Sequence, residues 1–165
     1  MNHETPIPNS YWVVPGKLLA GEYPRNLDHA SSLAKVKALL ETGVTAFVDL
    51  TEPDEPIEPY HHLLDGLGER AVSVRRFPIP DVSAPSSRQL VVQILDHIDH
   101  VMADGGIVYL HCWGGVGRTG TIVGCWLARH GYKGQAAIDR LQELWSQCTK
   151  CGHGGRWLAV GPGRP

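Results

Sequence analysis

Short apolar runs alternate with amphipathic stretches along most of the chain, and this pattern predicts strands and helices in turn. Runs rich in valine, leucine and aromatic residues predict strands at residues 11–14, 17–21, 44–50, 72–77 and 107–110. Apolar residues spaced by three and four predict helices at about residues 29–42, 60–67, 88–104, 119–128 and 137–145. Because strands and helices alternate, we predict an α/β fold: a central, mostly parallel twisted sheet flanked by helices.

Residues that favour helix caps and turns support these boundaries. Asn26 or Asp28 can cap the first long helix, and Ser86 or Ser87 can cap the strongest one. The turn at residues 15–16 makes a hairpin of the first two strands. The pattern ends after Gln147, so we predict one domain at residues 1–147 and a poorly ordered tail, rich in cysteine, glycine and proline, at residues 148–165.

Bulk composition narrows the class of protein. With 165 residues, 42% apolar content and a net charge of −2, the chain has no general attraction for nucleic acid or an anionic membrane surface. It opens on no signal-peptide pattern and has no apolar run of the ~20 residues that span a bilayer. Four cysteines do not make a disulfide scaffold at this length, and Cys125 lies in an apolar helix as a core residue. We therefore expect a soluble, cytoplasmic monomer.

One glycine-rich stretch, residues 111–120, links the last predicted strand to the next helix. Cys112 stands at the strand end and Arg118 at the helix start, with five residues between them. The loop glycines permit positive φ, so successive backbone N–H groups can turn inward as a nest for an anion such as phosphate or sulfate. The helix beginning near Thr119 directs its positive end at the loop, which lowers the pKa of a nearby thiol.

These residue types suit nucleophilic displacement at phosphorus. The thiolate of Cys112 can attack, the planar fork of Arg118 can bind two phosphate oxygens, and the Thr119 hydroxyl can help the thiolate leave. The leaving oxygen needs a proton from a carboxylic acid on a separate loop, and Asp81 in the proline-stiffened turn after a strand is our candidate. Other candidates for this acid are Asp49, Asp54 and Glu55.

The stretch His111-Cys112, five residues, then Arg118-Thr119-Gly120 resembles the signature of the cysteine-dependent protein tyrosine phosphatases. The short chain, the turn at residues 77–81 and the opening segment at residues 12–21 are similar to the compact dual-specificity branch. The resemblance covers roughly residues 11–145 and implies a protein tyrosine or dual-specificity phosphatase domain acting through a phosphocysteine intermediate, on a phosphorylated protein or peptide, without metal or cofactor.

Carried onto matching positions, the resemblance assigns the residue roles. Cys112 is the nucleophile, Arg118 the phosphate clamp, Asp81 the general acid, Thr119 the helper hydroxyl and His111 a residue that tunes the thiolate. Backbone donors to phosphate are Trp113, Gly114, Gly115, Val116 and Gly117, together with Arg118. The loop lacks the lysine typical of inositide phosphatases of this superfamily, and the tail after Gln147 differs from the family's closing helix.

Other interpretations of the same residues stay open. Gly115, Gly117 and Gly120 also match a dinucleotide-binding fingerprint, with Asp139 near the spacing of a ribose-binding acid. A catalytically weak module that only binds phosphoproteins, and a phosphatase of small phosphorylated metabolites, are the alternative functions. A further alternative is that Cys112 is an inert buried thiol.

Several polar groups have both a functional and a structural interpretation. Cys148, Cys151 and His153 could bind zinc, one short of the usual four ligands, or a tail cysteine could pair with an oxidised Cys112. Residues 96–100 have metal-like spacing but fit the solvent-facing side of a helix. Trp113 could stack on an aromatic phosphoester or only wall the pocket. The adjacent Arg75 and Arg76 could attract an anionic substrate or form a solvated strand end.

Overall fold

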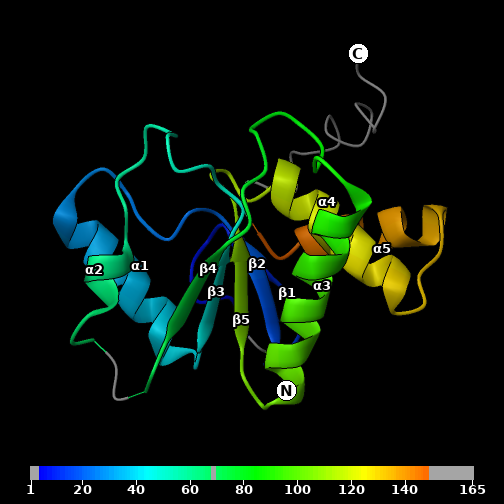
Figure 1. The fold of residues 1–165 in the computed structure, drawn as a ribbon. Helices are drawn as coiled ribbons and strands as arrows, with labels where there is room; N and C mark the ends of the chain where they lie inside the picture. Colours follow the sequence, from blue (N-terminus) through cyan, green and yellow to red (C-terminus); the bar gives the residue numbers. More distant parts are fainter. Residues whose placement is uncertain (1–3, 68–69, 149–165) are drawn as a thin grey trace.

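A five-stranded sheet runs through the middle of the protein in the computed structural model, which describes residues 4–67 and 70–148 (Figure 1). Its strands are β1 (Ser10–Val14), β2 (Leu18–Gly21), β3 (Ala46–Asp49), β4 (Ser73–Arg76) and β5 (Val108–His111). Their spatial order is β1-β2-β5-β3-β4. The β1–β2 hairpin is antiparallel and the other three pairings are parallel, which confirms the mostly parallel sheet.

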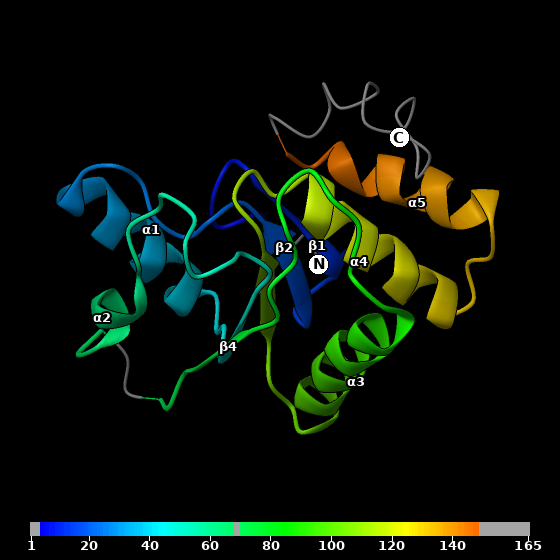
Figure 2. The same cartoon turned by 45° about the horizontal axis from the view of Figure 1, so that its top comes forward.

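Helices cover both faces of this sheet (Figures 1 and 2). On one side lie α1 (His29–Glu41) and α2 (His61–Leu64), and on the other α3 (Arg88–Ala103), α4 (Gly117–Arg129) and α5 (Gln135–Trp145). Alternate strand residues supply the two cores: Leu19 and Phe47 pack toward α1, whereas Val48 and Leu110 pack toward α3 and α4. Side-chain oxygens of Asp28 and Ser87 cap α1 and α3, two of the caps predicted as alternatives.

The carboxyl ends of three parallel strands meet at one edge of the sheet. Asp49, the last residue of β3, is in register with Arg76 of β4 on one side and with His111 of β5 on the other. In open α/β sheets, ligands bind at this edge. The loops that follow these strands therefore surround the residues predicted for the functional site.

Two differences from the sequence-based expectation affect the site and the core. Helix α4 begins at Gly117 rather than near Thr119, so Arg118 and Thr119 both lie in its first turn. At the other end, Cys148 is buried in the core, although we placed it in the tail. The predicted disorder of residues 149–165 lies outside the described residues. Within the described part of the chain, no helix is long and apolar enough to cross a membrane.

Candidate active site

The loop after β5 wraps around the sulfur of Cys112. This side chain is buried, and its Sγ accepts a hydrogen bond from the backbone N–H of Gly115 at 3.3 Å. Gly115 has a φ of 78°, and a Cβ atom there would come within 2.4 Å of the carbonyl carbon of Gly21. The end of β2 therefore supports the loop directly, and the Tyr23 N–H adds a hydrogen bond to the Trp113 carbonyl at 2.9 Å.

Helix α4 opens toward this loop with its first turn uncapped by any side chain. Its N-cap residue is Val116, whose side chain makes no capping hydrogen bond. The first N–H groups of a helix lack partners within the helix and carry the positive end of its dipole. The loop and the helix start thus form a site suited to a phosphate group beside the Cys112 sulfur.

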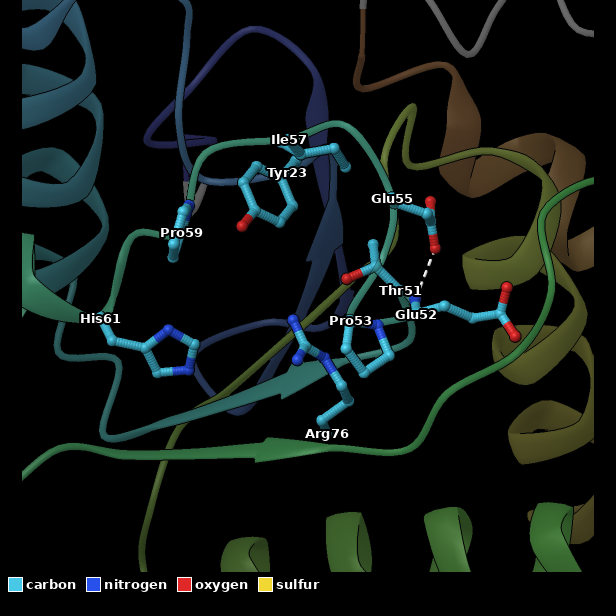
Figure 3. Close-up of a pocket in the computed structure, with 9 residues that line it drawn as sticks. All are labelled: Tyr23, Thr51, Glu52, Pro53, Glu55, Ile57, Pro59, His61 and Arg76. Carbon is cyan, nitrogen blue, oxygen red and sulfur yellow. Dashed lines mark hydrogen bonds between the residues drawn. The ribbon is translucent and has the colours of Figure 1, made fainter.

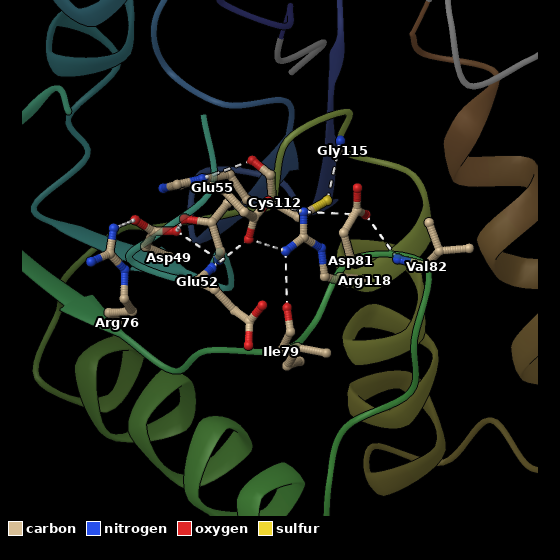
Figure 4. A network of polar contacts seen from close by, with 12 residues as sticks. Asp49, Glu52, Glu55, Arg76, Ile79, Asp81, Val82, Cys112, Gly115 and Arg118 are labelled. Carbon is tan, nitrogen blue, oxygen red and sulfur yellow. Dashed lines mark hydrogen bonds and ion pairs between the residues drawn. The ribbon is translucent and has the colours of Figure 1, made fainter. Parts of the chain in front are cut away.

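Arg118 is held in this first turn by contacts from two other loops (Figure 4). Its Nη1 and Nη2 atoms donate to the two carboxylate oxygens of Glu55 at 2.7 and 2.8 Å, and Nη1 also donates to the Ile79 carbonyl at 2.9 Å. Asp81 Oδ1 lies 3.3 Å from Nη2. The buried Nε atom has no hydrogen-bond partner among the described residues, so it can receive an acceptor from a ligand.

Glu55 is a site residue whose role sequence reasoning missed, because it was considered only as a possible general acid. Burial raises the pKa of its carboxyl, but hydrogen bonds from Arg118 and from the Glu52 N–H, with the charge of Arg118, outweigh burial and bring the pKa below its ordinary value. Glu55 is therefore ionised at neutral pH and orients the guanidinium. Its place in a proline-rich loop 63 residues before Arg118 offered no sequence signal for this contact.

Asp81 reaches the site from the loop after β4. Its side chain is 55% exposed, and its Oδ1 atom accepts the backbone N–H of Val82 at 2.9 Å besides contacting Arg118. Val82 has a φ of 56°, and it is the only non-glycine residue with a positive φ in the described part of the chain. Left-handed backbone is costly for a β-branched residue, so this loop stores strain beside the site.

His111 fixes the backbone of its neighbour Cys112. It is fully buried, with Nδ1 3.2 Å from the Cys112 carbonyl and Nε2 2.7 Å from the Tyr60 hydroxyl. A carbonyl oxygen only accepts, so we assign the ring hydrogen to Nδ1, and Nε2 accepts from Tyr60. Burial, the largest influence, lowers the pKa of His111 and keeps the ring neutral, while burial raises the pKa of Tyr60 and keeps its donor proton.

Three further polar residues decide which predicted roles remain available. Thr119 is fully buried in the first turn of α4, and its hydroxyl has no partner within the described residues. Asp49 is fully buried and accepts hydrogen bonds from the backbone N–H and the hydroxyl of Thr51, so it is not placed to donate a proton to a ligand. Asp54 is exposed on the loop, away from these contacts.

The metal and dinucleotide interpretations do not fit the contacts. Asp96 and Asp99 on α3 bind Arg129 of α4, and Asp99 also accepts from Trp126 Nε1 at 2.8 Å, so these acids join two helices. Cys148 is disulfide-bonded and is not a thiolate ligand for zinc; the other two candidate ligands lie outside the described residues. The predicted ribose acid Asp139 lies inside α5, and α4 leads to that helix rather than to a further strand.

A hollow lies under the segment of residues 51–59, beside the loop that joins β5 to α4, which we call the catalytic loop (Figure 3). It has a volume of about 320 Å³, and its polar lining includes Tyr23, Thr51, Glu52, His61 and Arg76. Glu55 belongs both to its wall and to the Arg118 contact. The hollow and the site around Arg118 are therefore neighbours, with the loop of residues 51–59 between them.

Comparisons with known sequences agree with this geometry. A family model described as the DSP-PTPase phosphatase domain of Swiss Army Knife proteins matches residues 7–153. The chain is 36% identical over 122 residues to protein 067L of Invertebrate iridescent virus 3, named by inference as a tyrosine phosphatase; the match covers 70% of this chain and 44% of that protein. It is 31% identical over 120 residues to laforin of Mus musculus, covering 65% and 35% of the two chains. The chain thus spans less than half the length of these relatives.

Solved structures share the same fold. Tk-PTP in its active form superposes with a TM-score of 0.67 at 25% identity, covering 93% of this chain and 95% of that one. The kinase associated phosphatase, solved with its catalytic cysteine replaced by serine, gives a TM-score of 0.68 at 14% identity, with 95% and 96% covered. The predicted phosphatase-type fold is confirmed.

Proposed function

Because the chain belongs to the protein tyrosine phosphatase superfamily, in its compact dual-specificity branch, we propose that it hydrolyses phosphate monoesters through a phosphocysteine intermediate. One observation carries the proposal: the Gly115 N–H is directed at the Cys112 sulfur, in the loop that leads into the uncapped start of α4. The backbone donors of residues 113–118 would surround the three non-bridging phosphate oxygens.

Phosphate binding rearranges the contacts of Arg118. The free Nε and the Nη2 atom, which now faces Asp81 at 3.3 Å, are the positions open to phosphate oxygens, whereas Glu55 keeps its bidentate hold. A phosphate oxygen on Nη2 would take the place of Asp81, whose side chain, in its carboxylic acid form, then reaches the ester oxygen. The strain at Val82 favours this movement, because leaving the left-handed region relieves it.

Two displacements then complete the reaction. The Cys112 thiolate attacks phosphorus, the S–P bond forms, the ester O–P bond breaks and Asp81 gives its proton to the leaving oxygen. A water molecule next attacks the phosphocysteine, Asp81 takes a proton from that water, and the S–P bond breaks to return the thiolate. The unpartnered Thr119 hydroxyl is available to donate to the departing sulfur.

For the substrate we propose a phosphorylated protein or peptide. Structures of this fold exist for TpbA of P. aeruginosa with phosphotyrosine and for PTPMT1 with the lipid PI(5)P, so the fold alone leaves the substrate open. The absence of lysine between Cys112 and Arg118 favours a phosphopeptide over an inositide. The half-exposed Trp113 at the entrance suits a substrate with an apolar or aromatic body. A thiolate nucleophile also favours a reducing, cytoplasmic location.

Hydrolysis of p-nitrophenyl phosphate in the presence of a chelator tests the proposal. We expect turnover between about pH 5 and pH 8. Cys112→Ser should lower kcat by about 10⁴-fold or more while phosphate still binds. Retained binding with no turnover in the wild-type chain would contradict the enzyme and support a phosphoprotein-binding module.

The general acid is tested with two variants and two kinds of leaving group. Asp81→Asn should lower kcat about 10²-fold for a phenyl or alkyl phosphate and flatten the basic limb of its pH profile, because poor leaving groups need the proton most. Asp54→Asn, an exposed carboxyl on the neighbouring loop, is the matched control and should leave both unchanged. Equal effects of the two variants would mean that Asp81 is not the general acid.

A further inference from the structure

We propose that the hollow under residues 51–59 is a second anion subsite, which binds another acidic or phosphorylated group of the same substrate. The inference rests on the proposed function, since it assigns a substrate preference to that site. It begins from a contrast between two neighbouring residues of β4. Arg75 and Arg76 follow each other in the chain, but their side chains lie on opposite sides of the sheet edge.

Arg75 has the structural role expected of a charged edge strand. Its guanidinium lies 4.8 Å from the centre of the Phe77 ring, and its Nη1 is 3.4 Å from His97 Nδ1 of α3. Charges on an edge strand prevent pairing with other chains. Arg75 therefore needs no ligand to explain it.

Arg76 instead lines the hollow beside the catalytic loop. Figure 3 shows its guanidinium, the His61 ring and the Thr51 hydroxyl directed toward a common space, while the Glu52 carboxylate turns away. One nitrogen, Nη2, contacts the buried Asp49 carboxylate at 3.4 Å. The other guanidinium nitrogen atoms of Arg76 contact no acceptor within residues 4–67 and 70–148, and the side chain is 35% exposed.

The acidic side chains around the hollow are either paired with an arginine or turned away from it. Glu55, the acid of its wall nearest the catalytic loop, is bound through both oxygens to Arg118. The buried Asp49 carboxylate is paired with the Arg76 guanidinium itself. Arg25 adds a second guanidinium at the rim, where its Nη1 donates to the carbonyl of Pro59 at 3.1 Å. Because Thr51 donates its hydroxyl hydrogen to Asp49 and Tyr23 donates its own to the Glu58 carbonyl, the donors left to face the hollow are the Arg76 guanidinium and the His61 ring.

The register of the sheet fixes the distance between the two sites. His111 precedes Cys112 at the end of β5, Asp49 ends β3 and Arg76 ends β4, so Arg76 stands two strands from the nucleophile. Neighbouring strands lie about 4.8 Å apart, which places the subsite roughly 10 Å from the phosphate nest. An extended peptide rises about 3.3 Å per residue, so the second anion would stand roughly two or three residues from the phosphorylated one.

Paired peptides measure this preference. The probes are a phosphotyrosine peptide with alanine flanks and the same peptide with glutamate, or a phosphate mimic that cannot be hydrolysed, two or three residues to either side. We expect about a tenfold higher kcat/KM for the doubly anionic peptide, expressed in KM and weakened by salt. The ratio between the two peptides, taken within each variant, cancels any change in the chemical step.

Arg76→Gln should bring that ratio to about one, whereas Arg75→Gln, with the same loss of charge, should keep it. His61→Ala removes an exposed donor without disturbing the core, and it should lower the ratio partially. A sugar bisphosphate compared with its monophosphate tests whether the second anion belongs to a metabolite. A larger Arg76-dependent gain in kcat/KM for the sugars than for the peptides would indicate a metabolite substrate.

The two hypotheses fail in different ways. No hydrolysis of either peptide would overturn the proposed function, and calorimetric binding of the same peptides would still measure the subsite. Hydrolysis of both with a ratio near one in the wild-type chain, or equal losses in the Arg75 and Arg76 variants, would overturn the subsite alone.

Discussion

Gly115 lies where the loop between β5 and α4 packs against the backbone at the end of β2. Its φ of 78° disfavours any side chain, and a Cβ atom would lie 2.4 to 2.6 Å from backbone atoms of Gly21 and Glu22. Gly115→Ala should displace the loop and its N–H from the Cys112 sulfur. Because a displacement of about 1 Å can cost about 10²-fold in rate, we expect a loss of that order in kcat/KM.

Gly114 supplies the matched comparison within the same loop. A Cβ atom there meets no other group within 4 Å, so Gly114→Ala should lose much less activity. Kinetics on p-nitrophenyl phosphate, with a thermal melt to confirm folding, measure both variants. Equal losses would mean that loop flexibility, rather than the close approach to Gly21, limits the reaction.

The loop of residues 51–59 acts as one element that controls Arg118 from outside the catalytic loop. The Glu55 carboxylate on this loop has its pKa lowered below the ordinary 4.5 by its contacts with Arg118, despite burial. A depressed pKa in the folded state adds stability that is fully present above pH 4.5 and is lost as the pH falls through the lowered value. We expect Glu55→Gln to destabilise the protein by about 2 kcal/mol at neutral pH.

Urea unfolding at neutral pH and near pH 3 checks the sign of this effect. The wild-type and Glu55→Gln curves should differ at neutral pH, and the difference should shrink in acid as the pH falls through the lowered pKa of the wild-type carboxyl. Glu52→Gln changes the same charge on a side chain directed outward, and it should follow the wild type. A difference between Glu55→Gln and wild type that persists in acid would show that the charge is not what Arg118 requires.

This loop also marks where prediction from sequence stopped. Regular periodicity placed each strand and helix, including the short α2, because burial repeats every two or about 3.6 residues in such elements. The loop has three prolines, four acids and no period, so nothing in it pointed to Arg118. The structure brings Glu55 to Arg118 across 63 residues, a contact that depends on where β3 lies in the sheet.

The nucleophile loop was predictable because its chemistry is local. Cys112, the glycines and Arg118 lie within seven consecutive positions between a strand and a helix, so spacing alone brings them together. The contacts of Tyr60 with His111 and of Arg76 with Asp49 were not predictable, since both join residues far apart in the chain, and the second depends on the register of β3 and β4. The role of Asp81 remains a prediction, supported by its contact with Arg118.

At the scale of the whole molecule, a side chain near the end of the described domain binds the backbone of its first strand. Strand β1 is an edge of the sheet, and its outer side at Trp12 is closed by the amide of Gln147. The Trp12 N–H donates to Gln147 Oε1 at 2.9 Å, and Gln147 Nε2 donates to the Trp12 carbonyl at 3.0 Å. The amide thus imitates a neighbouring strand and covers an exposed edge.

This contact predicts that stability and activity respond separately to residues at the end of the domain. Gln147→Ala should lower the free energy of unfolding by about 1–2 kcal/mol, because two part-buried backbone groups lose their partner. The phosphate loop follows β5, which lies two strands from β1, so kcat/KM of the folded protein should not change. Gln135→Ala, which removes a surface amide bound to Asp139 within α5, is the control and should cost less than about 0.5 kcal/mol. Urea unfolding with activity measured in parallel decides the point: equal stability of the two variants would mean that water replaces the amide at the β1 edge.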